Sequence, residues 1–383
     1  MIHNHLGPFA ALLLCLSATL RPALHAEPAE QPQPKDAQAT VNGASVAITP
    51  KIKHDRLDFF SHRIQFLTAD SLTQFRYMDS APRKVTARDE YYKISTRVQI
   101  NLVGDGITYL QARGESGRSF TSSYDYTGIG VHHPYWSFNL KSLYLGQKIG
   151  QHLEAQAGGI EYDQGVGTEM TYNDNDGWLE GYRLRYVGLG HGLPDKVSVT
   201  VGYVGDYSQP NVLARLPHMG DENYVQVLAV EKLGKNRDLS VEFDSLQTIR
   251  YAREAFRWQT LPIPVAPDLT LEAIIRASDD PTFGWAGSLG RKLDKKARFR
   301  AGMFYSDMPK GMFQRGRAQI FWNGDSYALG KRVGPSFRVA PFRDFDVTLW
   351  GSDRLDRTPG TRYRGQITVH YQLASLLNRS VHH

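Results

Sequence analysis

Residues 363–373 read YRGQITVHYQL and show the pattern that decides the fold. Apolar residues and one glycine alternate in this stretch with five polar residues: Arg364, Gln366, Thr368, His370 and Gln372. Successive side chains of a β-strand point to opposite faces, so a strand here has one apolar and one polar face. About 9–11 residues are enough for a tilted strand to cross a bilayer. The stretch also lies near the end of the chain, where the last strand of a barrel pairs with the first.

The same alternation recurs along the chain. It is clearest at residues 92–102, 110–115, 196–203, 239–244, 271–276 and 298–305, and weaker at 138–147, 223–233 and 315–340. At roughly 20 residues per strand and connection, the chain has room for about sixteen strands, with fourteen or eighteen also compatible. The predicted fold is all-β, a transmembrane antiparallel β-barrel. Val199 is expected to face lipid and Thr200 the lumen.

The connections between these strands differ in length. Residues 234–238 and 293–296 read as short periplasmic turns, whereas 118–136, 163–177, 206–222 and 250–268 read as outer loops. Residues 56–72 fit either a short helix or a first strand.

The chain begins with a pattern typical of an export signal. Residues 9–20 form an apolar run too short to span a membrane as a helix, and Leu24 and Ala26 precede a plausible cleavage point. A buried amino-terminal helix is the alternative, and Pro22 argues against it. The predicted organisation is a signal peptide at 1–26, a Pro-rich spacer at 27–55, the barrel at 56–373 and a short C-terminal tail at 374–383.

Alternation alone does not separate a membrane barrel from a soluble β-protein, because the apolar face points to lipid in one and to a core in the other. The export signal, many tyrosines on apolar faces and the single cysteine, Cys15 within the signal, favour the bacterial outer membrane and contact with its lipid. No run of 18 apolar residues predicts a spanning helix. A formal net charge of +6 is a mild excess and does not suggest a nucleic-acid partner.

Charged residues on the polar faces are the candidate pore-lining residues. They are Lys93, Arg97, Arg113, Glu115, Lys141, Arg183, Arg185, Glu242, Asp244, Glu272, Arg276, Arg298, Arg300 and Arg364. Basic residues outnumber acidic ones in this set, and a ring of basic side chains in a pore raises the local concentration of anions. A lumen filled with ion pairs that stiffen the barrel without selecting solutes is an equally compatible interpretation.

Signals for chemistry are weak. The segment YNDNDG at 172–177 lacks the spacing of a calcium loop, His132 and His133 lie in an expected loop, and no G-x-S-x-G elbow is present. No cofactor, metal or enzymatic activity is expected.

Residues 138–187 contain the runs FNLKSLYLGQKIG, LEAQAGGIEYDQGVG and WLEGYRLRYVG. A strand pair, a glycine-rich polar segment and a strand with an aromatic-Gly-x-Arg element, in this order, resemble the alginate-export family of outer-membrane porins. The matching residues are Gly158, Gly159, Glu161, Gly165, Gly167, Gly181, Arg183 and Arg185. Ala157 and Gly158 stand where the family has a basic residue. The resemblance implies a single-chain export or diffusion channel with a basic, ion-paired lumen.

These observations predict an outer-membrane porin that passes small hydrophilic solutes, anionic or carbohydrate-like, through a basic lumen. Two alternatives stay open. One is a structural or adhesive barrel whose loops bind outside the cell, and the other is a secreted or periplasmic carbohydrate-binding β-protein.

Overall fold

The computed structural model describes residues 63–374 and 377, apart from gaps at 82–84, 104–105, 118–137, 168–170, 172–177, 189–193, 205–210, 247, 264–266, 278–279, 295, 297, 310–311, 313–329, 343 and 357–359. The chain divides into two compact units, Met1–Lys53 and His54–His383, and every described residue belongs to the second. The predicted signal peptide, the whole predicted spacer and most of the predicted tail therefore lie outside the described residues.

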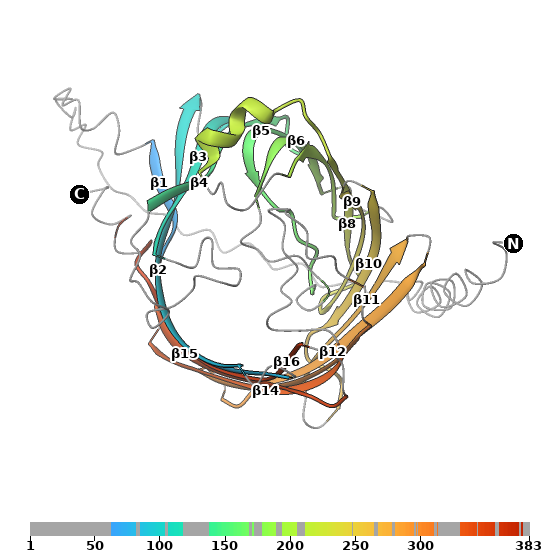
Figure 1. The fold of residues 1–383 in the computed structure, drawn as a ribbon. Coiled ribbons are helices and arrows are strands. Elements are labelled where there is room, and N and C mark those ends of the chain that lie inside the picture. The colour runs from blue at the N-terminus through green and yellow to red at the C-terminus, as the bar shows by residue number, and fades with distance from the viewer. Residues whose placement is uncertain are drawn as a thin grey trace, which may run out of the picture. The chain divides into compact units, whose positions relative to one another are not determined.

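Sixteen strands form one closed barrel (Figure 1). They are β1 (Ile64–Ala81), β2 (Val85–Val103), β3 (Thr108–Gly117), β4 (Phe138–Ile149), β5 (Leu153–Glu161), β6 (Trp178–Val187), β7 (Lys196–Tyr203), β8 (Tyr224–Lys232), β9 (Arg237–Leu246), β10 (Ile249–Trp258), β11 (Asp268–Ala277), β12 (Thr282–Lys292), β13 (Phe299–Met308), β14 (Gly330–Phe342), β15 (Phe345–Arg354) and β16 (Gly360–Gln372). The prediction of about sixteen strands is confirmed.

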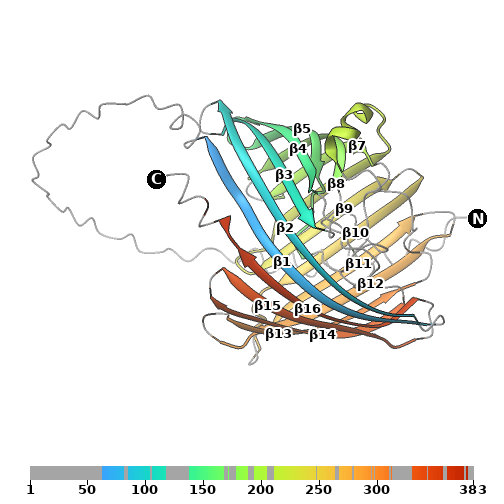
Figure 2. The ribbon, with the colours of Figure 1, turned by 60° about the vertical axis from the view of Figure 1, so that its left-hand side comes forward.

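Each strand pairs antiparallel with its neighbours in the sequence, and β1 pairs with β16 to close the ring. The strands run steeply tilted along the wall, as Figure 2 shows for the long β1 and β2. This up-and-down order places the long β3–β4, β5–β6, β7–β8 and β13–β14 connections at one end and the turns β4–β5, β8–β9 and β12–β13 at the other. Outer-membrane barrels have short periplasmic turns and longer extracellular loops, which orients the chain.

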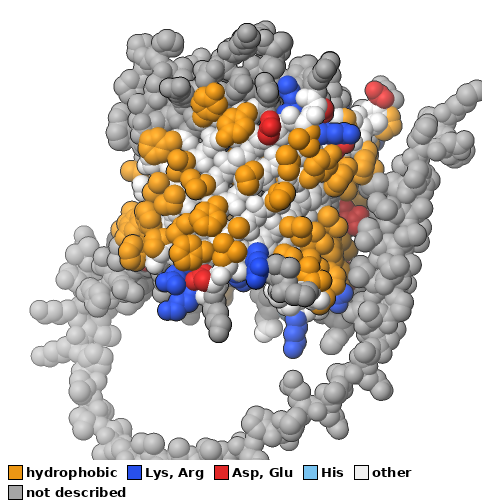
Figure 3. Space-filling model, turned by 90° about the horizontal axis from the view of Figure 1, so that it is seen from below, with side chains coloured by type: hydrophobic (Ala, Val, Ile, Leu, Met, Phe, Trp, Pro, Cys, Tyr) orange, Lys and Arg blue, Asp and Glu red, His pale blue; other side chains and the backbone are white. Residues whose placement is uncertain are grey.

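The outer face of the barrel is apolar. Val199 is 41% exposed, whereas its neighbour Thr200 is completely buried. The same alternation gives an exposed Phe243 beside a buried Glu242, and an exposed Leu271 beside a buried Glu272. Figure 3 shows apolar side chains spread over this face, with charged side chains gathered toward its edges. An apolar band around a closed ring of strands is the surface that lipid requires, because closure leaves no backbone group of the sheet unpaired.

Among the described residues up to the end of β16, helical structure occurs only in the β7–β8 connection. It comprises α3 (Val212–Arg215) and the 3-10 turn η2 (Leu216–His218). The side chain of Asn211 begins α3 by accepting a hydrogen bond from the Leu213 amide. None of the helices in the described residues has the length and apolar character to span a membrane.

Two sequence-based expectations are settled in detail, and two others lie wholly or mostly outside the described residues. Residues 250–268 are not one outer loop, because β10 occupies Ile249–Trp258 and the remainder is a connection at the periplasmic end. Residues 56–72 contribute the start of β1 rather than a helix, from Ile64 onward. Only the end of the 315–340 candidate is described as a strand, β14, and the loop expected at 118–136 lies outside the described residues.

Candidate functional site

The connection between β5 and β6 turns into the barrel. Its described residues, 162–167 and 171, are called here the inward segment, which Figure 1 shows in green inside the ring of strands. Tyr162 donates a hydrogen bond of 2.7 Å from its hydroxyl to Oε1 of Glu242 on β9. Further along, Oγ of Ser240 lies 2.7 Å from the Val166 amide nitrogen and 2.9 Å from its carbonyl oxygen. Residues 163–177 belong to the long β5–β6 connection, as expected of an outer loop, but its described residues turn into the barrel, where polar groups on the wall bind them.

Glycine makes the close approach of this segment possible. A Cβ atom added to Gly165 would lie 2.8 Å from Cβ of Ser240, closer than side chains pack. At its far end, Oε2 of Glu272 accepts hydrogen bonds of 2.8 Å from both the amide and the hydroxyl of Thr171. Nε of Arg253 donates to the Thr171 carbonyl oxygen at 2.9 Å. The inward segment is thus bound to three consecutive strands, β9, β10 and β11.

Asp163 is the charged anchor of the inward segment. Its carboxylate is 2.6 Å from Nζ of Lys196 and accepts a 2.7 Å hydrogen bond from Ser198. Gln226 donates to its carbonyl oxygen at 2.8 Å. Burial opposes ionisation here, yet the positive charges of Arg183 and Arg185 hold the pKa of Asp163 well below its ordinary value. The carboxylate is therefore ionised throughout the physiological pH range.

Most of the candidate pore-lining residues on β2–β6 are joined in ion pairs. Arg97 pairs with Glu161, and Arg113 pairs with Glu115 at 2.5 Å and with Glu161 at 3.3 Å. Lys141, fully buried, lies 3.9 Å from Glu115. Carboxylates neutralise this part of the wall locally, so it is not a ring of free positive charge.

Arg183 and Arg185 are also held in place. Arg183 is buried and donates to Oγ1 of Thr200 at 2.9 Å and to Oε1 of Gln156 at 3.1 Å. Arg185 lies 3.5 Å from Glu154 and 3.4 Å from Asp163. Arg185 thus fastens the inward segment to the wall through Asp163, and Arg183 joins β5, β6 and β7 beside it.

Arg253 on β10 is a functional candidate that the sequence interpretation missed. Its NH1 atom lies 3.1 Å from Glu242 and 2.6 Å from Asp244, two of the predicted acidic residues, and all three side chains are buried. Residues 250–258 carry four charged residues, which obscured the strand pattern there. The alternating apolar pair Phe256 and Trp258 was the signal that could have revealed it.

The remaining candidates are spread over β2, β11, β13 and β16 and the turn before β13. Arg364 on β16 is buried and lies over the Trp350 ring at 5.5 Å, and Arg276 on β11 is partly buried. Arg300 on β13 is exposed. Arg298 precedes β13 and pairs with Asp294 at 3.0 Å in the periplasmic turn, so it is not part of a strand face. The side chain of Lys93 lies outside the described residues.

A second polar cluster lies at the closure of the barrel. His370 on β16 contacts Asp70 on β1 at 3.1 Å and Asp346 on β15 at 3.3 Å, and Arg338 pairs with Asp346 at 2.8 Å. Among the described residues, no group of three or more His, Cys, Asp and Glu side chains has the arrangement of a metal site.

The extracellular rim above β4–β6 is covered by α3. Val212 packs over Gly159, where a Cβ atom would leave no room for it. Arg215 is fully buried, donates to the Lys141 carbonyl oxygen at 3.1 Å and lies 3.5 Å from Glu180. Burial lowers the pKa of Arg215 to about 9 against the opposing charge of Glu180.

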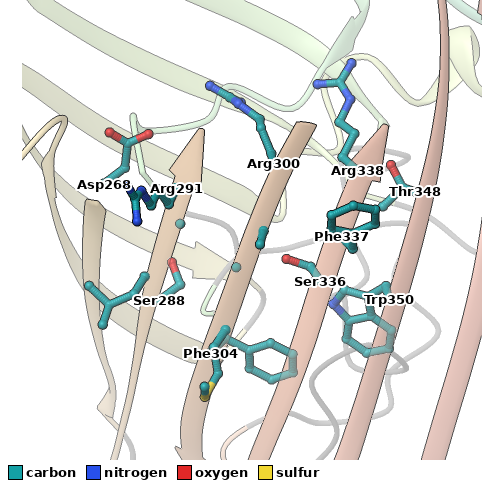
Figure 4. Close-up of a pocket in the computed structure, with 15 residues that line it drawn as sticks. Asp268, Ser288, Arg291, Arg300, Phe304, Ser336, Phe337, Arg338, Thr348 and Trp350 are labelled. Atoms are coloured by element: carbon teal, nitrogen blue, oxygen red, sulfur yellow. The ribbon is translucent and has the colours of Figure 1, made fainter. Parts of the chain in front are cut away.

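Two cavities open beside these residues. One of about 310 Å³ lies between the inward segment and the ion pairs of β2–β6, and is lined by Arg97, Gln111, Glu161 and Asp163 among others. The other, of about 360 Å³, lies against β11–β15 and is lined by glycines, serines, arginines and aromatic residues (Figure 4). Both are within the range of about 300–1,000 Å³ that is usual for small-molecule sites.

Comparison with solved structures shows a likeness to porins. Salmonella typhi OmpF, in a complex with daunomycin, is 11% identical and matches 82% of this chain and 98% of its own, with a TM-score of 0.54. A mutant of the Rh. blastica porin is 8% identical and matches 81% of this chain and 99% of its own, with a TM-score of 0.51. At this identity the likeness concerns the fold alone.

Comparisons of the sequence with family models and with curated proteins give no match. The resemblance of residues 138–187 to the alginate-export family is therefore not supported by a family model. What stands is the coarser relationship: a closed barrel of sixteen strands with the fold of bacterial porins and an apolar outer face. These features make the chain a protein of the bacterial outer membrane.

Proposed function

We propose that this protein is a porin, a passive channel for small hydrophilic solutes with a preference for anions. The inward segment is the observation that supports this proposal. Its anchors lie on β6–β11, so the wall formed by β12–β16 faces it across the lumen. Solutes pass between the segment and that wall. No catalytic step is part of this function.

The anion preference rests on which charges have partners. Arg113 and Arg185 are balanced by carboxylates at 2.5–3.5 Å, and Arg97 pairs with Glu161. Fixed charges that cancel locally exert little field along a pore. On the opposite wall, Arg300 and Lys292 form no ion pair with any residue that the structure describes. We assign the larger share of the selectivity to these exposed basic residues and the smaller share to Arg183 and Arg185.

Reconstitution of the purified protein into planar bilayers tests the proposal. A porin gives steady single-channel conductance, and a salt gradient gives a reversal potential on the anion side that shrinks as salt concentration rises. A folded barrel without steady conductance supports the alternative, a structural or adhesive role for the loops. Steady conductance with a cation-side reversal potential retains the channel and rejects its anion preference.

A further inference from the structure

The cavity against β11–β15 has two glycines in its floor. Gly290 on β12 and Gly302 on β13 are cross-strand neighbours there, on the same sheet face as the buried Phe304. A Cβ atom at Gly290 would meet nothing closer than the Ala301 carbonyl oxygen at 3.9 Å. The missing side chains, rather than a gap between strands, create the hollow.

The periplasmic end of this hollow is basic. Arg300 stands directly opposite Lys292 on β12 and Arg338 on β14, which makes a row of three cations across adjacent strands. Like charges directly opposite one another destabilise a sheet. Asp346 pairs with Arg338, but Lys292 and Arg300 make no ion pair or hydrogen bond from their side chains to any described residue. Figure 4 shows Arg300 and Arg338 reaching past the same end of the hollow.

The other end of the hollow is apolar and aromatic. Phe304 and Trp350 stack with ring centroids 5.6 Å apart and ring planes 5° apart. The two stacked rings line this end of the cavity together. Ser288 and Ser336 line the cavity between these rings and the basic row (Figure 4). Asp268 lines one side, and its carboxylate accepts a hydrogen bond of 2.8 Å from the Thr260 amide.

We propose that this hollow is a solute-binding subsite for a small monocarboxylate that carries a flat apolar ring. The carboxylate binds the guanidinium of Arg300, helped by Arg338, and the ring lies on the glycine floor against Phe304 and Trp350. The basic residues Arg291, Lys292, Arg300 and Arg338 outnumber Asp268 and Asp346, so the hollow keeps an excess of positive charge that favours a carboxylate. A planar guanidinium recognises a planar carboxylate through two parallel hydrogen bonds.

A small inorganic anion does not explain the arrangement equally well. Such an anion would bind the basic residues Lys292, Arg300 and Arg338, but it would make no contact with the stacked rings of Phe304 and Trp350 or with the glycines of the floor. The proposal deepens the porin function proposed above and rests on it, because a subsite on the solute path holds a solute before release to the periplasm.

Calorimetric titration of the folded protein in detergent tests the subsite without measuring transport. The probes are benzoate, acetate (a carboxylate without a ring) and benzyl alcohol (a ring without a charge). Benzoate is expected to bind about tenfold more tightly than either, since each loses one of the two recognition elements. Equal affinity for acetate and benzoate overturns the ring assignment, and absence of benzoate binding overturns the subsite.

Two variants act on different parts of the hollow. Arg300→Gln removes the charge and Gly290→Val fills the floor, and each is expected to weaken benzoate binding about tenfold. Arg298→Gln is the matched control, because Arg298 is basic and exposed but pairs with Asp294 in the turn. Binding that is unchanged in a folded Arg300→Gln protein, or weakened equally in the Arg298→Gln protein, overturns the proposal. Heat-modifiable migration on gels verifies folding of each variant.

The two proposals fail separately. Steady conductance without benzoate binding leaves the porin intact and rejects the subsite. Benzoate binding that needs Arg300, in a barrel without conductance, retains the subsite and rejects the porin.

Discussion

Ser240 on β9 binds Val166 through both of its backbone polar groups, with its Oγ 2.7 Å from the amide nitrogen and 2.9 Å from the carbonyl oxygen. A single hydroxyl thus replaces the two partners that a neighbouring strand would supply. Because the contact joins residues 74 positions apart, it fixes the inward segment across the wall rather than along the chain.

Removing the anchors of the inward segment should widen the channel. Ser240→Ala deletes the contacts with Val166, and Glu272→Ala deletes the two hydrogen bonds from Thr171. We expect larger and noisier single-channel conductance for each variant. Backbone groups of the inward segment that lose their partner on the wall will move into the lumen water to hydrogen-bond there, which loosens the segment. Planar-bilayer recording measures this. Ser95→Ala is the control: it is also a buried serine of the inner face, on β2, and should leave conductance unchanged. Identical records for all three variants would show that the segment does not border the path.

The lipid face should reject charge at Val199. Arginine near the bilayer midplane destabilises a barrel by about 2–4 kcal/mol. Val199→Arg is therefore expected to lower the free energy of unfolding by that amount in a folding titration in lipid vesicles, and Val199→Ala to lower it by less. Similar losses for both variants would mean that Val199 does not face hydrocarbon.

Thr200, the inward neighbour of Val199, does not serve as a tolerant comparison site. It is fully buried and accepts a hydrogen bond of 2.9 Å from Arg183. Thr200→Arg should therefore be costly too, for reasons of space and charge inside the barrel.

Selectivity should respond more to Arg300 than to Arg183. Arg300→Gln removes an exposed charge without a described carboxylate partner, so the anion-to-cation permeability ratio should fall, most at low salt where the Debye length is long. Arg183→Gln removes a buried charge from a cluster of ion pairs and should change the ratio less. Reversal potentials at low and high salt compare the two. A larger effect at Arg183 would place the conduction path along β6.

Acid should release the anchor at Asp163. Its pKa is depressed in the folded protein, so the stabilisation that it provides is complete above the unfolded value, about 3.9, and is lost as pH falls from there toward the folded pKa. Urea titrations of the wild type and Asp163→Asn should differ by a constant free energy of unfolding above pH of about 5. That difference should shrink below about 4. A difference that grows on acidification would contradict this sign.

The strands were predictable from the sequence because alternation is a local signal. Val199, Phe243 and Leu271 reveal their outward direction through their immediate neighbours alone. β10 was missed because Arg253 and Glu254 interrupt the alternation. The carboxylates that neutralise Arg253 lie on β9, so no local window contains the explanation.

The inward segment was not predictable either, because the residues that bind it are far away in the sequence. Glu272, which binds Thr171, is 101 residues away from it, and polar residues near glycine read equally well as an exposed loop. The candidate pore-lining residues were chosen by face, and a face says nothing about partners. The two arginines differ in their surroundings: Arg183 is buried and hydrogen-bonded, whereas Arg300 is exposed.

The pairing of β1 with β16 has a consequence for biogenesis. Leu72 lies opposite His370 and Gln74 opposite Thr368, so the partner of β1 lies in a strand 294 positions further along at the Gln74–Thr368 pair. Until β16 arrives, β1 and the most recent strand both expose unpaired edges, which invite aggregation. A barrel that has not closed therefore keeps both of these edges, and the pairing of β1 with β16 removes them together.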